Sequence, residues 1–161
     1  MAVIMDGKET ARKIRENLKG KVDELKIKNI FPKLAVIMVG DDGASKIYVR
    51  NKSKACEEVG IEYEEFLLGD ETTQEELLKL INELNNRKDI NGILLQSPIP
   101  KHLDINEAFR TILPEKDVDG FNPINVGKLV LGQETLISCT PFGIIKLLEE
   151  YNVPIEGKNA V

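Results

Sequence analysis

The sequence predicts an α/β fold with a mostly parallel sheet and helices on both of its faces. Segments 34–39 and 90–96 have the length and apolar content of strands, and 61–67 alternates apolar and acidic residues as a strand does. The segments between them repeat apolar residues at helical spacing. The order strand, helix, strand, helix, strand implies right-handed crossovers between parallel strands. The first strand is apolar throughout, which is typical of a strand buried on both faces.

Composition excludes several classes of function. The 161 residues, 42% of them hydrophobic, fit one ordinary domain. A formal net charge of −5 gives no basic surface for nucleic acid, and no apolar run is long enough to cross a membrane. The N-terminus lacks the pattern of a secretion signal, and Cys56 and Cys139 are far apart, so we expect a cytoplasmic protein with free thiols. With His102 as the only histidine, we expect no metal site.

The elements follow in order along the chain. A helix is predicted from Gly7 to Lys28, because apolar residues recur there at steps of three or four. The strand at 34–39 ends at the turn Gly40–Gly43, and a second helix follows that turn directly. After the strand at 61–67, the run Thr72–Glu76 opens a third helix.

Beyond the third strand, turns and short helices are expected. Two prolines stiffen the loop Ser97–Pro100, Asp104 caps a short helix that runs to Arg110, and 114–123 is a turn-rich segment dense in carboxylates. A last helix is predicted with Thr140 as its cap and Pro141 in its first turn, running to Tyr151.

The chain is expected to divide near residue 139. Residues 1–139 form the α/β domain, and 140–161 supply a connecting helix followed by the first residues of another buried strand, so that a further domain would follow. There is no Gly-x-Gly-x-x-Gly and no phosphate-loop motif in the 161 residues. We therefore expect no dinucleotide to bind here.

Tyr48 and Lys52 are the most informative pair of residues. They are four residues apart in a predicted helix, so their side chains lie on the same face, where the pattern would otherwise place an apolar residue at position 52. One interpretation is that the lysine stem packs at the edge of the core while the ammonium reaches water. The other is a lysine in a partly dry cleft beside a phenol, where burial lowers a lysine pKa from about 10.4 and makes the amine an acid/base group.

The position of the site follows from the fold class. Ligands of open α/β sheets bind beyond the carboxyl ends of the strands. Those ends carry the Gly40 turn and the loop that begins at Gln96. We expect the site to include both.

Four motifs together resemble a known enzyme family. They are Tyr48-Val49-x-x-Lys52, Gly92-Ile93-Leu94-Leu95-Gln96-Ser97-Pro98-Ile99-Pro100, Pro114-Glu115-Lys116-Asp117-Val118-Asp119-Gly120 and Cys139-Thr140-Pro141-x-Gly143. In this order they resemble the bifunctional methylenetetrahydrofolate dehydrogenase/methenyltetrahydrofolate cyclohydrolase family. The family pattern has a proline near Gly43, a leucine at Ser97 and a proline at Ser138, and these three departures lie in loops.

The resemblance implies two reactions at one folate site. Methylenetetrahydrofolate is oxidised to methenyltetrahydrofolate with NADP, and the methenyl group is hydrolysed to 10-formyltetrahydrofolate. It also implies that NADP is bound by a domain beyond these residues, so that this chain alone would not transfer hydride. Tetrahydrofolate derivatives are the implied partners, and a homodimer is implied for the intact protein.

The resemblance also assigns roles to residues. Lys52 would be the catalytic acid/base group, Gln96 would hydrogen-bond and orient it, and Tyr48 would contact the substrate and relay a proton. Asp119 would bind the pterin ring, and the loop residues Ser97 and Pro98 would contact substrate.

Ser45 keeps more than one interpretation, and three other residues are expected to have no direct part in the site. Ser45 is expected to cap its helix, to support Lys52 or to contact substrate, while Asp117 is expected to be structural, Cys56 to lie in the core and His102 to have no assigned role. Asp119-Gly120 is also an ordinary turn sequence.

Two alternative functions stay open at the level of sequence. Asp41-Asp42 after an apolar strand is similar to the acidic cluster of a phosphoacceptor receiver-like signalling domain, which would bind magnesium. The second alternative is a folate-binding domain without turnover.

Overall fold

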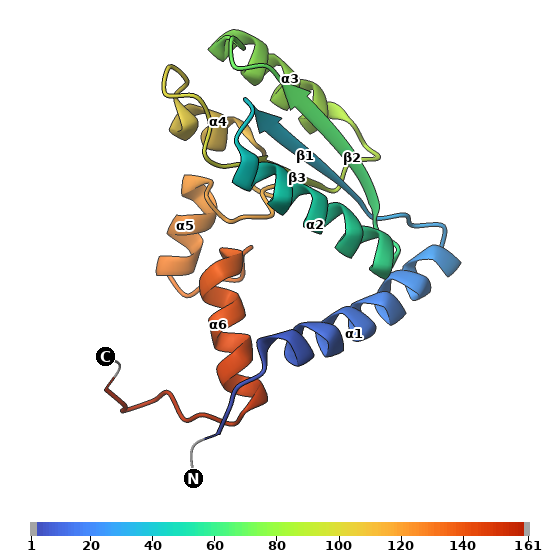
Figure 1. Cartoon of the computed structure of the whole chain (residues 1–161), viewed down its shortest axis with the longest axis vertical. Helices are drawn as coiled ribbons and strands as arrows, with labels where there is room; N and C mark the ends of the chain where they lie inside the picture. The colour runs from blue at the N-terminus through green and yellow to red at the C-terminus, as the bar shows by residue number, and fades with distance from the viewer. Residues whose placement is uncertain (1–2, 160–161) are drawn as a thin grey trace.

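The computed structural model describes residues 3–159 and confirms the α/β class. Its parallel sheet has the order β2-β1-β3, with β1 (Lys33–Val39) in the centre, β2 (Glu62–Leu68) at one edge and β3 (Gly92–Gln96) at the other. Figure 1 shows the sheet with its helices around it. The central position of β1 explains its unbroken apolar sequence, since all its residues from Ala35 to Val39 are buried.

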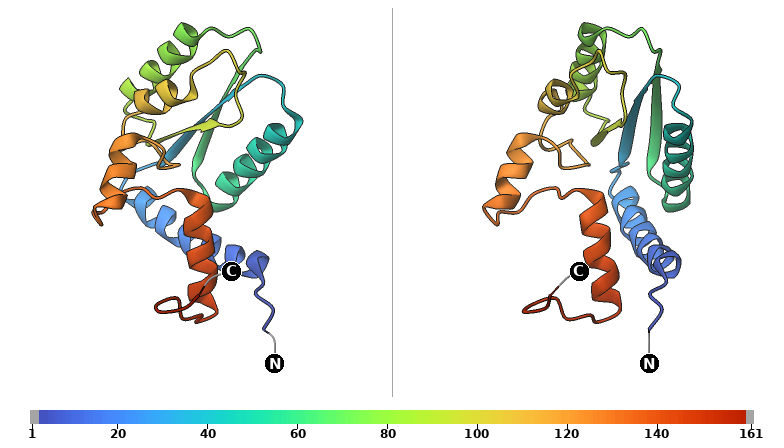
Figure 2. Two further views of the ribbon diagram at one scale, coloured as in Figure 1. Left: turned by 90° about the vertical axis from the view of Figure 1, so that its left-hand side faces the viewer. Right: turned by 60° about the vertical axis from the view of Figure 1, so that its left-hand side comes forward.

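Helices cover both faces of the sheet, as the strand–helix alternation predicts. The larger core cluster joins alternate residues of β1, such as Ile37, to Leu77 and Ile81 of α3 (Gln74–Asn86) and to Ala108 of α4 (Ile105–Thr111). The opposite face packs Val36 and Met38 against α2 (Gly43–Val59). The right-hand view of Figure 2 shows α2 on one side of the sheet and α3 with α4 on the other.

Side-chain caps determine where most helices begin. Asp6 accepts from two backbone N–H groups of α1 (Gly7–Ile27), and Asp42 caps α2. Thr73 and Glu76 form a reciprocal capping box at α3. Asp104 caps α4, as its position in the sequence indicates.

The last helix stands apart from the sheet. α6 (Cys139–Glu150) has no buried residue and leans on α1, where the Tyr151 hydroxyl accepts from the Asp6 N–H at 2.7 Å and Lys13 pairs with Glu150 at 2.5 Å. An apolar groove of about 680 Å³ runs between α1 and α6. No helix of residues 3–159 combines the length and the apolar character needed to cross a membrane.

Several expected elements need correction. The second and third strands run 62–68 and 92–96 instead of 61–67 and 90–96; Ile90 is buried, but it lies in the turn that precedes β3. Ser138, and not Thr140, takes the N-cap position of α6, so Thr140 lies within the first turn together with Pro141. Residues 153–159 form turns and contain no strand, while Ala160 and Val161 lie outside the described residues.

One helix was missed. α5 (Pro123–Val130) follows the turn-rich segment, with Asn122 as its cap and Pro123 at its first position. Asn followed by Pro is a helix-start signal, but the segment before it is so rich in turn residues that only a turn was expected.

Candidate functional site

A pocket of about 180 Å³ lies beyond the carboxyl end of β3. Its lining comes from α2, the end of β3, the turn-rich segment 114–123 and the start of α6, and consists of Lys52, Leu95, Gln96, Ser97, Asp119, Phe121, Ser138, Cys139 and Thr140. This location follows the rule that ligands of open α/β sheets bind beyond the carboxyl ends of the strands, here the end of β3. The Gly40 turn does not line this pocket; a β-carbon at Gly40 would meet Asp70 and Pro100 instead.

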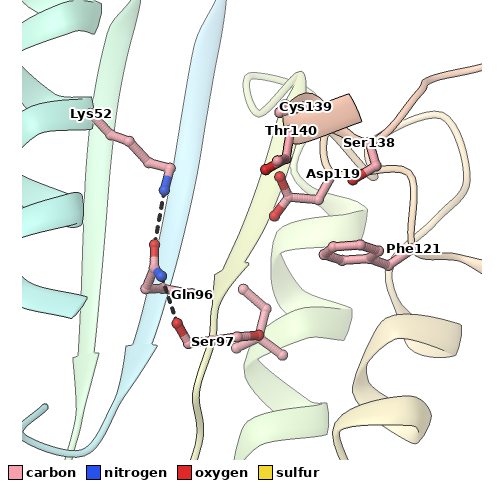
Figure 3. A pocket seen from close by; sticks show the side chains of 9 residues that line it. Lys52, Gln96, Ser97, Asp119, Phe121, Ser138, Cys139 and Thr140 are labelled. Carbon is pink, nitrogen blue, oxygen red and sulfur yellow. Dashed lines mark hydrogen bonds between the residues drawn. The ribbon is translucent and has the colours of Figure 1, made fainter. Parts of the chain in front are cut away.

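Lys52 and Gln96 form one wall of the pocket. The half-buried ammonium of Lys52 donates to the Gln96 side-chain oxygen Oε1 at 2.9 Å, and the Gln96 Nε2 donates to the Ser97 carbonyl at 2.7 Å (Figure 3). The amide is therefore held at both ends, so its oxygen points at the lysine. The remaining ammonium protons of Lys52 are available to water or a ligand.

Tyr48 and Ser45 do not line the pocket. The Lys52 Nζ lies 5.7 Å from the centroid of the Tyr48 ring, and 61% of Tyr48 is exposed, so its ring is not packed into the core. Ser45 is buried in the first turn of α2, where its N–H donates to Asp42 at 2.7 Å. Asp42 is the cap, and the interpretation of Ser45 as a cap is wrong.

The opposite wall is built from the turn-rich segment 114–123 and the start of α6. Figure 3 shows Asp119 and Phe121 across the pocket from Lys52, beside the first residues of α6. The turn depends on Gly120, whose φ is +67° and where a β-carbon would stand 2.8 Å from the Leu136 carbonyl oxygen. Glycine thus allows residues 136–138 to approach and close the pocket.

Burial controls the electrostatics of this wall. It raises the pKa of the Asp119 carboxyl, while the positive charge of Lys52 opposes the rise, the charge of Asp117 adds to it, and a hydrogen bond with Cys139 lowers it. The pKa of the Cys139 thiol is raised as well, mainly by burial and then by the charge of Asp119. The site therefore holds a partly desolvated carboxylate opposite an ammonium.

A test of this electrostatic arrangement is the dependence of stability on pH. The pKa of Asp119 in the folded chain lies above its unfolded value of about 3.9, so this group lowers stability as pH rises through the folded-state pKa. We expect Asp119→Asn to melt at the same temperature as the parent chain at a pH below that unfolded value, and at a higher temperature at neutral pH. Calorimetric melting across the pH range measures the difference, and a lower melting temperature of the variant at neutral pH would contradict it.

The predicted site residues are only partly brought together. Lys52, Gln96, Ser97 and Asp119 line one pocket, although they come from distant parts of the chain. Pro98 is exposed and lies outside the lining. Asp117 is buried and His102 bonds the Thr72 carbonyl at 2.9 Å, as expected of residues with no direct part in the site.

Asp119 was the only candidate residue on the wall opposite Lys52. Phe121, Ser138, Cys139 and Thr140 line it as well. An aromatic residue directly after the Asp119-Gly120 turn, and the Cys-Thr-Pro motif, were the available signals.

Neither a metal nor a dinucleotide fits the described residues well. Within 3–159, no three His, Cys, Asp or Glu side chains are grouped to hold a metal ion. The turn after β1 carries Asp41 and Asp42 at the start of α2, where negative charge would repel a pyrophosphate. The loop after β3 contains Pro98 and Pro100, which have no N–H to offer a phosphate.

Comparisons with known proteins identify the family of the chain. Residues 5–119 match the model of the catalytic domain of tetrahydrofolate dehydrogenase/cyclohydrolase. The chain is 56% identical over 159 residues to the bifunctional protein FolD of Methanosarcina mazei, and 52% identical over 160 residues to that of Lysinibacillus sphaericus. These matches cover 98% and 99% of this chain, but only 55% and 56% of the relatives, so it spans about half of their length.

Solved structures have the same fold. The bifunctional FolD enzyme of Campylobacter jejuni superposes with a TM-score of 0.95 at 49% identity, covering 97% of this chain and 56% of that one. A methylenetetrahydrofolate dehydrogenase-cyclohydrolase of Trypanosoma brucei, solved with NADP and an inhibitor, gives 0.92 at 35% identity, covering 98% and 54%.

Proposed function

The chain belongs to the tetrahydrofolate dehydrogenase/cyclohydrolase family, and we propose that the pocket between Lys52 and Asp119 binds tetrahydrofolate derivatives and hydrolyses the methenyl bridge. The observation that carries this proposal is the position of one amine, held by a fixed amide, across a small pocket from a partly buried carboxylate. These are the groups needed to move a proton and to hold a pterin ring.

Hydrolysis requires proton transfer at two points. Water attacks the methenyl carbon between N5 and N10, and the free amine of Lys52 takes a proton from that water as the C–O bond forms. The resulting ammonium then gives the proton to N5 as the C–N5 bond breaks, and the hydroxyl proton leaves to solvent as the formyl carbonyl forms. One proton is released overall, which balances the loss of the positive charge of the substrate.

Gln96 keeps the amine in place for this sequence. Its amide oxygen accepts from Lys52 and its NH₂ group is committed to the Ser97 carbonyl, so the oxygen cannot easily turn away. A neutral acceptor orients the amine without favouring its charged form as strongly as a carboxylate would.

Changes at Gln96 test that role. We expect Gln96→Ala to lower the rate of hydrolysis about tenfold, because Lys52 is no longer oriented but can still accept and donate a proton. Gln96→Glu is expected to lower the rate at least as much, because a carboxylate at 2.9 Å would hold Lys52 as a charged ammonium. A Gln96→Glu chain that hydrolyses faster than Gln96→Ala would contradict the need for a neutral partner.

Asp119 supplies recognition in the proposed complex. The amino and amide groups of a pterin are a planar pair of donors, which an aspartate can accept with both oxygens. Phe121, held against Phe109 with ring centroids 4.9 Å apart, places an apolar surface beside that carboxylate. Tyr48 is proposed to meet the aminobenzoyl part of the substrate at the rim, where its ring is exposed.

Hydride transfer is proposed only for the longer relatives. NADP-dependent oxidation needs a dinucleotide site, and neither the acidic turn after β1 nor the proline-containing loop after β3 suits a pyrophosphate. We propose residues 1–139 as the folate domain and 140–161 as the start of the connection to a nucleotide-binding domain. A homodimer and a cytoplasmic location are also proposed, the latter supported by two cysteines, Cys56 and Cys139, that form no disulfide.

The receiver-like alternative finds little support. Asp42 caps α2 and Asp41 pairs with Lys46, so both carboxylates have local partners. The family match is to a folate enzyme. Folate binding without turnover stays the competing proposal.

One assay separates these proposals. Methenyltetrahydrofolate loses its absorbance on hydrolysis, and we expect the chain to accelerate that loss above the uncatalysed rate. If the rate equals that of buffer while a folate analogue still binds, the domain binds without turnover. If neither is seen, the proposed function is wrong.

A further inference from the structure

We propose that Asp117 is a positioning residue, which holds the turn that carries Asp119 and Phe121 in the shape that binds folate. This inference rests on the proposed function of the pocket. Asp117 is only 2% exposed and does not line the pocket, so it cannot touch a ligand there.

The Asp117 carboxylate binds two donors of the chain itself. Its Oδ2 accepts from the Asn122 backbone N–H at 2.8 Å and from the Asn125 Nδ2 at 2.9 Å. A buried carboxylate held only by neutral donors is costly unless those donors are well placed. The two bonds link position 117 to the start of α5 and so close a loop over residues 118–121.

The two asparagines are fixed in turn by other segments. The Asn122 Nδ2 donates to the Ile112 carbonyl at 2.8 Å, while its Oδ1 caps α5 by accepting from Ile124 at 2.9 Å. Asn125 donates to the Pro114 carbonyl at 2.8 Å and accepts from the Thr135 hydroxyl at 2.9 Å. Both asparagines are 3% exposed.

The N-terminal end of the same turn is held by separate hydrogen bonds of Lys116. Lys116 donates through Nζ to the Asn85 and Arg87 carbonyls, each at 2.7 Å, at the end of α3, and its carbonyl accepts from the Ile93 N–H at 2.7 Å. The turn is thus held to the sheet at 116 and to α5 at 122. Among the residues of this turn, only Asp119 and Phe121 line the pocket, and both lie between positions 116 and 122.

Asp117 affects both the backbone turn beside Asp119 and the pKa of the Asp119 carboxyl. The Asp117 carbonyl accepts from the Gly120 N–H at 3.3 Å, which sets the turn directly after Asp119. The charge of Asp117 also contributes to the raised pKa of Asp119. The Asp117 carboxylate itself acts on Asp119 through its bonds to Asn122 and Asn125 and through its charge, and it makes no contact with the proposed substrate.

The test compares two substitutions at position 117. Asp117→Asn can present one oxygen to both donors and so keeps the geometry without the charge, whereas Asp117→Ala loses both bonds. We expect Asp117→Ala to weaken binding of 5-formyltetrahydrofolate tenfold or more in calorimetry, and Asp117→Asn to stay within about threefold of the parent chain. At saturating substrate, the turnover of methenyltetrahydrofolate by Asp117→Ala should fall much less than its affinity does.

A matched control distinguishes positioning from loss of stability. Asp6 also accepts from two backbone N–H groups, at 2.9 and 3.0 Å, but far from the turn, so Asp6→Ala should lower the melting temperature without changing folate binding. Equal affinities for parent chain and folded Asp117→Ala would overturn the inference, as would equally weak binding by the Ala and Asn variants. If the parent chain binds no folate, it is the proposed function that fails.

Substitutions at Thr135 test the same positioning role if Asp117→Ala does not fold. Thr135→Val removes the hydroxyl that donates a hydrogen bond to Asn125, and Thr135→Ser keeps that hydroxyl. We expect about threefold weaker binding for the valine variant and parent-like binding for serine. Parent-like binding by both would overturn the inference.

Discussion

Lys52→Met is expected to abolish measurable hydrolysis of methenyltetrahydrofolate while leaving folate binding nearly intact. Methionine has a similar length and apolar stem, so the packing along α2 is preserved, but it can neither accept nor donate the proton. Positioned acid/base groups contribute typically 10²- to 10⁴-fold to rate, so a loss of that size is expected. Decay of methenyl absorbance measures the rate, and calorimetry measures the binding.

Two further variants identify which property of the lysine matters. Lys52→Arg keeps a positive charge that does not deprotonate near neutral pH, and it should be as inactive as methionine if the free amine is needed. Lys54→Met removes an exposed lysine from the same helix and should behave as the parent chain. Hydrolysis by Lys52→Met at the rate of the parent chain would remove Lys52 from the mechanism.

Asp119→Asn is expected to cause the largest loss of folate affinity. The substitution keeps the shape of the side chain, but it removes the charge and places an NH₂ group against the donors of the pterin. Hydrogen bonds to a charged group contribute about 1.5–3 kcal/mol each, so the loss of a two-point contact should weaken binding by roughly 100-fold or more. Because burial disfavours the charge of Asp119, the same variant should be no less stable than the parent chain at neutral pH.

The control for Asp119 is a carboxylate in the same turn. Glu115 is exposed and lies outside the pocket, so Glu115→Gln removes the same charge from the chain without touching the proposed contact. We expect it to bind 5-formyltetrahydrofolate as the parent chain does. Equal binding by Glu115→Gln and Asp119→Asn would show that Asp119 makes no special contact.

Local patterns were sufficient to predict most of the fold. The unbroken apolar run of β1 identifies a central strand, and Asp104 shows where α4 begins, because each signal is confined to a few neighbouring residues. The start of α6 was misplaced for the same reason: Thr140-Pro141 is a strong local signal, yet the helix begins at Cys139 without any side-chain cap. Its start lies where the chain meets the pocket wall beside Gly120.

The site was predictable only in part. The spacing of Tyr48 and Lys52 indicates a shared helix face, but the contact of Lys52 with Gln96 spans 44 positions and depends on the packing of α2 against the sheet. The bonds of Asp117 to Asn122 and Asn125 were not predicted, because asparagines in a turn-rich segment usually serve the turn itself. The exposed ring of Tyr48 likewise depends on what lies beside the helix and not on the helix pattern.

The most direct test of the folate pocket is a map of backbone amide chemical shifts in ¹⁵N-labelled chain titrated with 5-formyltetrahydrofolate. We expect the amides of residues 95–97, 119–121 and 138–140, which belong to three of the four segments at the pocket, to shift together with one affinity. Shifts confined to the groove between α1 and α6, or the absence of any shift at saturating ligand, would contradict the assignment of the folate site to this pocket.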